Sequence, residues 1–172
     1  RRCERKDHPM TDQAPLNFAI ITCSDTRDLR QDAAGDALER LIAEQGWVCR
    51  THTLVRDERP NIAAAIKHCT DDLKVDIVLT CGGSGLSPRD VTPEATHDVC
   101  EREVPGIAEA MRWHSLQITP FAMLSRAVCM QRGSSLVINL PGSTKAATEN
   151  WEGVVAALPH AAKMMAAGGH DD

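Results

Sequence analysis

Three glycines, Gly82, Gly83 and Gly85, and a charged pair shortly after them, Arg89 and Asp90, are the residues in this sequence best suited to chemistry. Glycines at this spacing allow positive φ angles and close approach of the backbone to a ligand, and successive N–H groups in such a loop form an anion site. An arginine can neutralise the anion, and a carboxylate can hold a cation. The spacing excludes a Walker loop and a dinucleotide fingerprint, because no Gly-Lys-Ser/Thr and no third dinucleotide-type glycine follow. Alone, the glycines fit a phosphate loop and an ordinary strand-to-helix turn equally well.

The flanking residues must position this loop. Residues 75–80 form a short apolar run rich in β-branched side chains, which is typical of a buried parallel strand. After the loop, Thr92 has the character of a helix N-cap, Pro93 that of the first helical residue, and Glu94 falls in the first turn. A strand, a glycine loop and a helix start are therefore predicted in succession.

The same alternation of strands and helices is predicted along most of the chain from its apolar periodicity. Strands are predicted at residues 16–22, 47–55, 75–80, 127–130 and 135–140. Helices are predicted at residues 32–45, 60–73, 93–103 and 107–116, with a last helical region, interrupted near Pro159, that runs to residue 167. This order predicts an α/β fold with a mostly parallel central sheet in a single domain, residues 16–167. Residues 1–15 are expected to be a flexible tail, and residues 168–172 a second tail.

Polar loops follow four of the predicted strands, and parallel sheets bind ligands beyond the carboxyl ends of their strands. These loops hold Ser24 and Asp25, then Asp57, then residues 82–90, then residues 139–143. Two carboxylates, Asp57 and Asp90, suit Mg²⁺, which takes one or two carboxylates together with phosphates and water. In the last loop, Gly142 permits a tight turn, and the following helix start attracts phosphate.

Each of these groups also has an ordinary structural interpretation. Asp57 can be a solvated loop carboxylate, and Asp90 can favour the positive end of a helix dipole. Ser24 and Asp25 can form a turn or a cap, and Asp32 is expected to be an N-cap. Residues 139–143 can be a plain strand-to-helix connection. The residues alone leave these alternatives open.

Composition excludes several classes of function. The net charge of −5 and the presence of only three Trp, two Phe and no Tyr argue against a nucleic-acid partner. No apolar run approaches the length of a membrane span, and residues 1–15 lack the apolar core of a secretory signal. Seven cysteines, an odd number without a Cys-x-x-Cys motif, favour free thiols in the cytoplasm over a disulfide framework or a zinc site.

Gly-Gly-Ser-Gly at residues 82–85, followed by Arg-Asp-Val-Thr-Pro-Glu-Ala at 89–95, resembles the signature of the molybdopterin adenylyltransferases, a family of molybdenum-cofactor biosynthesis that includes the N-terminal domain of gephyrin. Ser84 stands where the family usually has Thr, and the hydroxyl is retained. Asn-Leu-Pro-Gly-Ser at residues 139–143 resembles a second family element. Ser115, Ser125 and Arg126 resemble its Ser-Leu and Ser-Arg elements. The resemblance covers residues 16–167.

The resemblance implies a three-layer α/β/α fold and Mg²⁺-dependent transfer of AMP from ATP to the terminal phosphate of molybdopterin, with release of pyrophosphate. It implies that Asp57 and Asp90 hold the metal and are the catalytic residues. The residues expected to contact substrate or phosphate are Ser24, Asp25, Gly82, Gly83, Ser84, Gly85, Arg89, Ser115, Asn139, Pro141, Gly142, Ser143 and Lys145. Arg126 is left between a phosphate contact and a structural salt bridge.

The resemblance also implies a homotrimer and delivery of the product to a separate molybdate-inserting protein. Ala- and Met-rich helical faces, with Ala108, Met111, Met164 and Met165, are candidates for packing between subunits. The alternative is a non-catalytic module of the same fold that holds pterin or nucleotide, and a weaker one is a nucleotide hydrolase. The pair Asp57 and Asp90 favours the enzyme.

Overall fold

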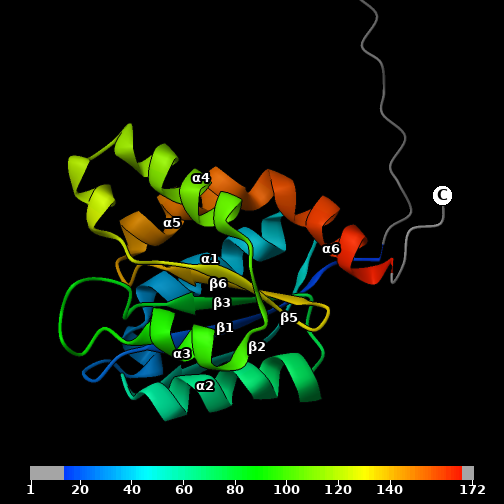
Figure 1. Cartoon of the computed structure of the whole chain (residues 1–172), viewed down its shortest axis with the longest axis horizontal. Coiled ribbons are helices and arrows are strands. Elements are labelled where there is room, and N and C mark those ends of the chain that lie inside the picture. Colours follow the sequence, from blue (N-terminus) through cyan, green and yellow to red (C-terminus); the bar gives the residue numbers. More distant parts are fainter. Residues whose placement is uncertain (1–13, 168–172) are drawn as a thin grey trace, which may run out of the picture.

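The computed structural model describes residues 14–167, and its central sheet has six strands in the order β2-β1-β3-β6-β5-β4 (Figure 1). The strands are β1 (Asn17–Cys23), β2 (Val48–Val55), β3 (Ile77–Cys81), β4 (Arg102–Glu103), β5 (Cys129–Arg132) and β6 (Ser135–Leu140). β1, β2, β3 and β6 are parallel, whereas β5 runs antiparallel to β6 and to β4. The expected mostly parallel sheet is confirmed.

Helices cover both faces of this sheet, as the three-layer prediction requires (Figure 1). One layer contains α1 (Ala33–Glu44), α4 (Pro105–Leu116), α5 (Thr144–Val154) and α6 (Leu158–Ala166), and the other contains α2 (Arg59–Lys67) and α3 (Thr92–Val99). Shorter helical segments are η1 (Leu29–Gln31), η2 (His68–Asp72), η3 (Pro120–Leu124) and η4 (Val155–Ala157).

Successive side chains of the central strands enter opposite apolar cores, because a strand points alternate residues to opposite faces. Phe18 and Ile20 of β1 pack with Leu38 of α1 in one core. Ala19 and Ile21 pack with the helices of the other layer. Both faces of β1 and β3 are therefore buried, which explains why these strands read as continuous apolar runs.

A buried polar group connects β1, β2 and α1. Asp32 is the N-cap of α1, as expected, and its Oδ1 accepts the Gly35 N–H at 3.0 Å. Its other carboxylate oxygen accepts the Thr22 hydroxyl and lies 2.7 Å from Nε2 of His52. Nδ1 of His52 lies 2.7 Å from Oε1 of Glu39. This group attaches the edge strand β2 to the start of α1.

The region after the glycine loop differs from the prediction. Thr92 lies inside α3 instead of capping it, and its hydroxyl donates to Gly82 O at 2.9 Å. α3 ends at Val99 rather than at residue 103, because residues 102 and 103 pair with β5 as a short strand. α4 begins at Pro105, two residues earlier than predicted.

Two further findings bear on the sequence predictions. Among residues 14–167, no helix is both long and apolar enough to span a bilayer. The expectations for the tails lie almost wholly outside the described residues.

Candidate functional site

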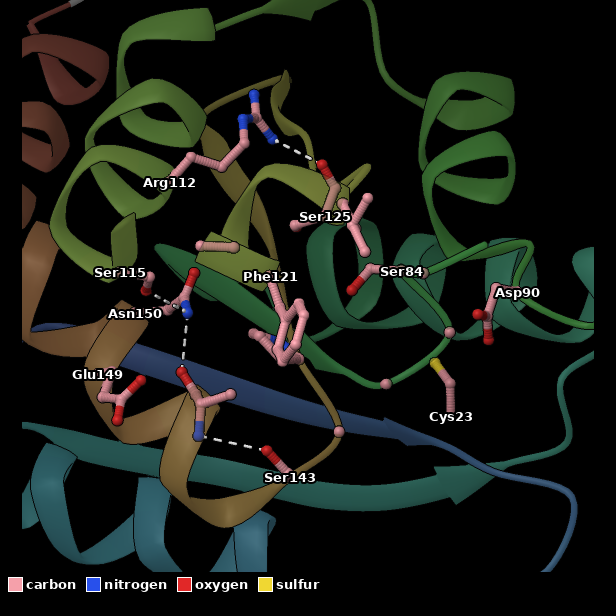
Figure 2. Close-up of a pocket in the computed structure, with 18 of the residues that line it drawn as sticks. Cys23, Ser84, Asp90, Arg112, Ser115, Phe121, Ser125, Ser143, Glu149 and Asn150 are labelled. Atoms are coloured by element: carbon pink, nitrogen blue, oxygen red, sulfur yellow. Dashed lines mark hydrogen bonds between the residues drawn. The ribbon is translucent and has the colours of Figure 1, made fainter. Parts of the chain in front are cut away.

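The carboxyl ends of β1, β3 and β6 border a cavity of about 530 Å³ (Figure 2). The glycine loop, residues 82–85, forms one side of it, and residues 141–143 lie beside that loop before α5 begins. The opposite side is formed by α4, η3 and the first turns of α5. Three of the four predicted polar loops therefore contribute to one cavity, as the parallel sheet dictates.

Gly82 and Gly83 show why the loop needs glycine. Their φ angles are +104° and +68°, in the region that side-chain-bearing residues avoid. A Cβ on Gly82 would lie 2.5 Å from Cys23 O, and one on Gly83 would lie 2.3 Å from Thr92 Oγ1. The turn can thus press against β1 and α3 only without side chains, and its backbone remains at the cavity surface.

Arg126 holds the glycine loop in place through hydrogen bonds to its carbonyl oxygens. Its backbone N–H donates to Ser84 O at 2.9 Å, and its guanidinium donates to Gly85 O and to Asp90 O, each at 2.7 Å. The same guanidinium forms an ion pair with Glu94 of α3. Of the two roles left open for Arg126, the structure shows the structural salt bridge.

Asp57 and Asp25 bracket the loop on the side of β2. The backbone N–H of Asp25 donates to Asp57 Oδ2, and that of Asp57 donates to Asp25 Oδ1, both at 3.1 Å. The guanidinium of Arg89 donates two hydrogen bonds to the Asp25 carboxylate, of 2.9 and 3.1 Å, and a third to Glu58, of 2.9 Å. The hydrogen bonds from Arg89 hold the pKa of Asp25 below its ordinary value. Arg89 is therefore engaged by carboxylates instead of facing the cavity.

One of the two carboxylate oxygens of Asp57 lacks a hydrogen-bond partner among the described residues. Its Oδ1 is buried and, among the residues described, accepts no hydrogen bond. Burial, the negative charge of Asp25 and then that of Asp90 raise the pKa of Asp57 above its ordinary value. A buried unpaired oxygen beside other carboxylates costs free energy in the absence of a cation. It is the arrangement expected of a group that binds a positive ion.

Asp90 completes the carboxylate set from the other side of the glycine loop. It lines the cavity, and its Oδ2 accepts the Ser87 N–H at 3.1 Å, so it does not cap α3. A Cβ on Gly85 would lie 2.9 Å from that oxygen. In residues 14–167, no group of three or more His, Cys, Asp or Glu is arranged to hold a metal by itself. Two carboxylates without further protein ligands fit Mg²⁺ that completes its shell with phosphate and water.

The predicted substrate residues separate into two groups. The cavity is lined by Ser24, Gly82, Gly83, Ser84, Gly85, Ser115, Pro141, Gly142 and Ser143. Asp25, Arg89, Asn139 and Lys145 do not line it, and neither does Asp57. Asp57 and Asp25 nevertheless adjoin the loop, since Asp57 Oδ1 lies 3.1 Å from where a Cβ of Gly83 would be.

Two predicted substrate residues, Asn139 and Lys145, lie outside the cavity for different reasons. The Asn139 side chain is completely buried, donates to the hydroxyls of Thr80 and Thr96 at 3.0 Å, and accepts the Val128 N–H at 3.2 Å. It joins β3, α3 and the start of β5 and has no access to a ligand. Lys145 is 82% exposed and lies 3.8 Å from Glu149. The expectation that the Asn139 side chain touches substrate is therefore wrong, whereas contact between Lys145 and substrate stays a prediction.

Several lining residues were missed by the sequence prediction: Arg27, Arg112, Phe121, Glu149 and Asn150. Arg27 donates to Gly142 O at 2.7 Å, and Arg112 donates to Ala127 O at 2.8 Å. For Glu149 and Asn150, the sequence signal that could have found them was their helical spacing. Glu149 and Asn150 follow Ala146 at helical intervals of three and four residues, so all three share a face of α5.

Cys23 also lines the cavity, but it is not a nucleophile. Burial raises the pKa of its thiol to about 12, so the thiol stays protonated at neutral pH. Chemistry in this cavity therefore depends on backbone N–H groups, two arginines and carboxylates. Such a set can position and neutralise phosphate groups.

A family model described as a probable molybdopterin binding domain matches residues 19–160. The chain belongs to this molybdopterin-binding family. The protein named molybdopterin adenylyltransferase in Haemophilus influenzae is 48% identical over 146 residues, or 82% of this chain and 74% of that protein. The molybdenum cofactor synthesis protein cinnamon of Drosophila melanogaster is 36% identical over 87% of this chain, which spans only 26% of cinnamon.

A solved structure supports the same membership. The molybdopterin biosynthesis enzyme MoaB from Thermus thermophilus matches with a TM-score of 0.82 and 43% sequence identity, over 87% of this chain and 96% of that one. The family resemblance and the three-layer fold expected from the sequence are thereby confirmed.

Proposed function

We propose that this chain is a molybdopterin adenylyltransferase of molybdenum-cofactor biosynthesis, which transfers AMP from ATP to the terminal phosphate of molybdopterin and releases pyrophosphate. The observation that supports this most is one cavity in which a glycine loop, two arginines and Asp90 converge, with the unpaired Asp57 oxygen beside the same loop. Relatives named for this activity cover most of the chain at 45–48% identity.

The reaction requires positioning more than covalent help from the protein. An oxygen of the pterin's terminal phosphate forms a bond to the α-phosphorus of ATP, and the bond from that phosphorus to the β-bridging oxygen breaks. Backbone N–H groups of residues 83–85 and the start of α5, capped by Ser143, would hold the phosphates. Arg27 would neutralise their charge from the β1 side. Fixed donors and charges of this kind account for most catalysis of phosphoryl transfer.

Asp57 and Asp90 would hold a Mg²⁺ ion. When bound, such an ion neutralises the charge that develops on the phosphate oxygens. The carboxylates themselves keep the ion at the edge of the glycine loop, and Asp25, paired with Arg89, keeps Asp57 in place. This assignment is supported by the unpaired Oδ1 of Asp57 and by the raised pKa of that carboxyl.

Assembly into homotrimers is part of the proposal, and of the four residues expected at its surface Met164 is exposed. Ala108 and Met111 are buried in the core and are not available to a neighbour, and Met165 packs against the same core. Large apolar side chains are also exposed on α4, on η3 and between them, namely Trp113, Leu116, Ile118 and Met123. Light scattering at micromolar concentration should give the mass of a trimer, and a monomer would reject this part.

The cytoplasm is the proposed compartment, with a separate molybdate-inserting protein as the recipient of the product. Among the described residues, six cysteines are free: Cys23, Cys49, Cys69, Cys81, Cys100 and Cys129. Free thiols in several buried positions suit a reducing compartment.

The test is turnover. Purified protein with molybdopterin, ATP and Mg²⁺ should form adenylylated molybdopterin and pyrophosphate in equal amounts, and omission of molybdopterin should stop ATP consumption. Binding of both substrates without transfer would show the non-catalytic module. Consumption of ATP without pterin would show a hydrolase.

A further inference from the structure

The cavity continues beyond the glycine loop to a second end, built by Ser115 of α4, Phe121 of η3, and Glu149 and Asn150 of α5 (Figure 2). Asn150 Nδ2 donates to Ser115 Oγ at 3.1 Å and to Ala146 O at 2.8 Å, which fixes one wall of this end. The proposed catalysis assigns no task to Phe121 or Glu149.

Glu149 is a carboxylate without an adequate partner. Its side chain is 14% exposed, and within residues 14–167 its only ion-pair contact is the highly exposed Lys145, 3.8 Å away. No described residue donates a hydrogen bond to it. The carboxylate lines the cavity, so a ligand that fills this end displaces its remaining water and must supply donors, since a carboxylate can only accept.

The sign of this charge excludes phosphate as the partner. A carboxylate repels phosphate oxygens, so Glu149 suits a part of the ligand that carries hydrogen-bond donors, either N–H or O–H groups. Two adjacent donors would satisfy both carboxylate oxygens, in the side-by-side geometry that makes such pairs strong.

We propose that Glu149 recognises the pyrimidinone edge of the pterin ring, and that Phe121 lies against the face of that ring. The 2-amino group and N3–H of a pterin are adjacent donors, so both can donate to one carboxylate. Adenine presents a donor next to an acceptor, so it can satisfy only one oxygen. Glu149 therefore selects the pterin over the nucleotide base at this end of the cavity. The assignment deepens the proposed function and rests on it.

Phe121 has the position that ring stacking requires. Its side chain lines the cavity and is 76% exposed. The segment that carries it is fixed locally, because Pro120 begins η3 and the Thr119 hydroxyl accepts the Phe121 N–H at 3.3 Å. A phenyl face stacks on any flat ring and does not read its edge. Phe121 and Glu149 thus make separable contributions.

The test uses two probes that differ only at the edge. 6-Hydroxymethylpterin has the 2-amino group, and 6-hydroxymethyllumazine has a carbonyl in its place. Ring fluorescence titrated with the whole wild-type chain should show tighter binding of the pterin by about 10-fold or more, the loss expected for one hydrogen bond to a charged group. In Glu149→Gln the amide offers one acceptor and one donor, so this preference should disappear. Phe121→Ala should weaken both probes by a similar factor.

Controls separate a specific contact from a general disturbance. Glu152→Gln changes an exposed carboxylate on the same helix and should leave the preference intact. In the transfer reaction, Glu149→Gln should raise KM for molybdopterin and leave KM for ATP unchanged.

Each remaining outcome is decisive. A wild-type chain without preference for the pterin, or a Glu149→Gln variant that keeps it, overturns the assignment. A rise in KM for ATP alone would place adenine at this end and also overturn it. A chain that prefers the pterin but transfers no AMP would reject the proposed function and leave the recognition site standing. Normal transfer without the preference would do the reverse.

Discussion

Replacement of Asp57 by Asn tests whether this carboxylate serves an ion or the fold. The Asp25 N–H donates to Asp57 Oδ2 at 3.1 Å, and the oxygen of an Asn amide can accept the same bond. The amide nitrogen would occupy the place of Oδ1, which has no hydrogen-bond partner in the described chain. Asp57→Asn therefore removes charge while it keeps shape and the one observed bond.

The expected effects on activity and stability have opposite signs. AMP transfer should fall by about 100-fold or more, comparable to loss of one strong transition-state contact. Stability should not fall, because burial and the charge of Asp25 raise the pKa of Asp57 and so disfavour its ionised form in the folded protein. Its removal should change the free energy of unfolding by at most about 1 kcal/mol, or about 3 °C in Tm for a chain of this size.

The pH dependence of stability gives the direction in which Asp57→Asn should change Tm. The pKa of Asp57 is higher in the folded than in the unfolded chain, so wild-type stability is lost as pH rises from the ordinary carboxyl value, about 4, through the raised folded value. Asp57→Asn should therefore melt at the same temperature or slightly higher at pH 7. That difference should shrink as pH falls toward about 4.

Calorimetry in EDTA and a transfer assay with Mg²⁺ measure both effects. Addition of Mg²⁺ with ATP should raise Tm of the wild type and less so that of Asp57→Asn, because a bound ligand stabilises the state that binds it. Asp72→Asn, at an exposed carboxylate of η2, is the matched control and should change neither quantity. Near-normal transfer in Asp57→Asn would refute the metal assignment. A Tm loss of several degrees would show that Asp57 is chiefly structural.

Three further outcomes follow from the same structure. Asp90→Asn should lower AMP transfer by about 100-fold with little change in Tm, and the double variant with Asp57→Asn should lose less than the product of the two factors, as a kinetic assay can show. Burial raises the pKa of Asp32, but hydrogen bonds from Thr22, Gly35 and His52 outweigh it and hold that pKa below the ordinary value. Asp32→Asn should therefore lower Tm at pH 7. This deficit in Tm should fade as pH drops through the folded pKa. Lys145→Ala should change kcat/KM by less than about 3-fold, since Lys145 does not line the cavity, and a larger fall would support the substrate contact expected from the sequence.

The strands and the glycine loop could be predicted because their signals are local. Residues 75–80 are apolar on both faces, as only a strand buried between two helical layers is, and the three glycines mark the turn that follows. The short strand β4 was missed because nothing in Arg102 and Glu103 favours a strand. Only pairing with β5, which is distant in sequence, places them there, and the same pairing ends α3 early.

The site shows the same division. Asp90 and Ser143 adjoin recognisable turns, so their place at the cavity followed from the sequence. Asn139 belongs to the same Asn-Leu-Pro-Gly-Ser element as Ser143, yet its side chain is buried. It bonds to α3, and the packing of α3 cannot be predicted from this element. Glu149 was missed because its helical spacing from Ala146 marks a shared face of α5 but does not say that this face borders a cavity. The cavity exists only because α4 packs against α5, and the sequence does not show that packing.

The position of Arg126 has a consequence for how the two ends of the cavity are held relative to each other. This residue follows directly after the segment that carries Phe121 and Ser125, and its bonds to Ser84, Gly85 and Asp90 join that segment to the glycine loop. A shift of either part must be transmitted to the other. The spacing between the ring end and the phosphate end of the cavity is therefore set in part by one arginine side chain. Arg126→Ala would remove the guanidinium bonds that fix this spacing.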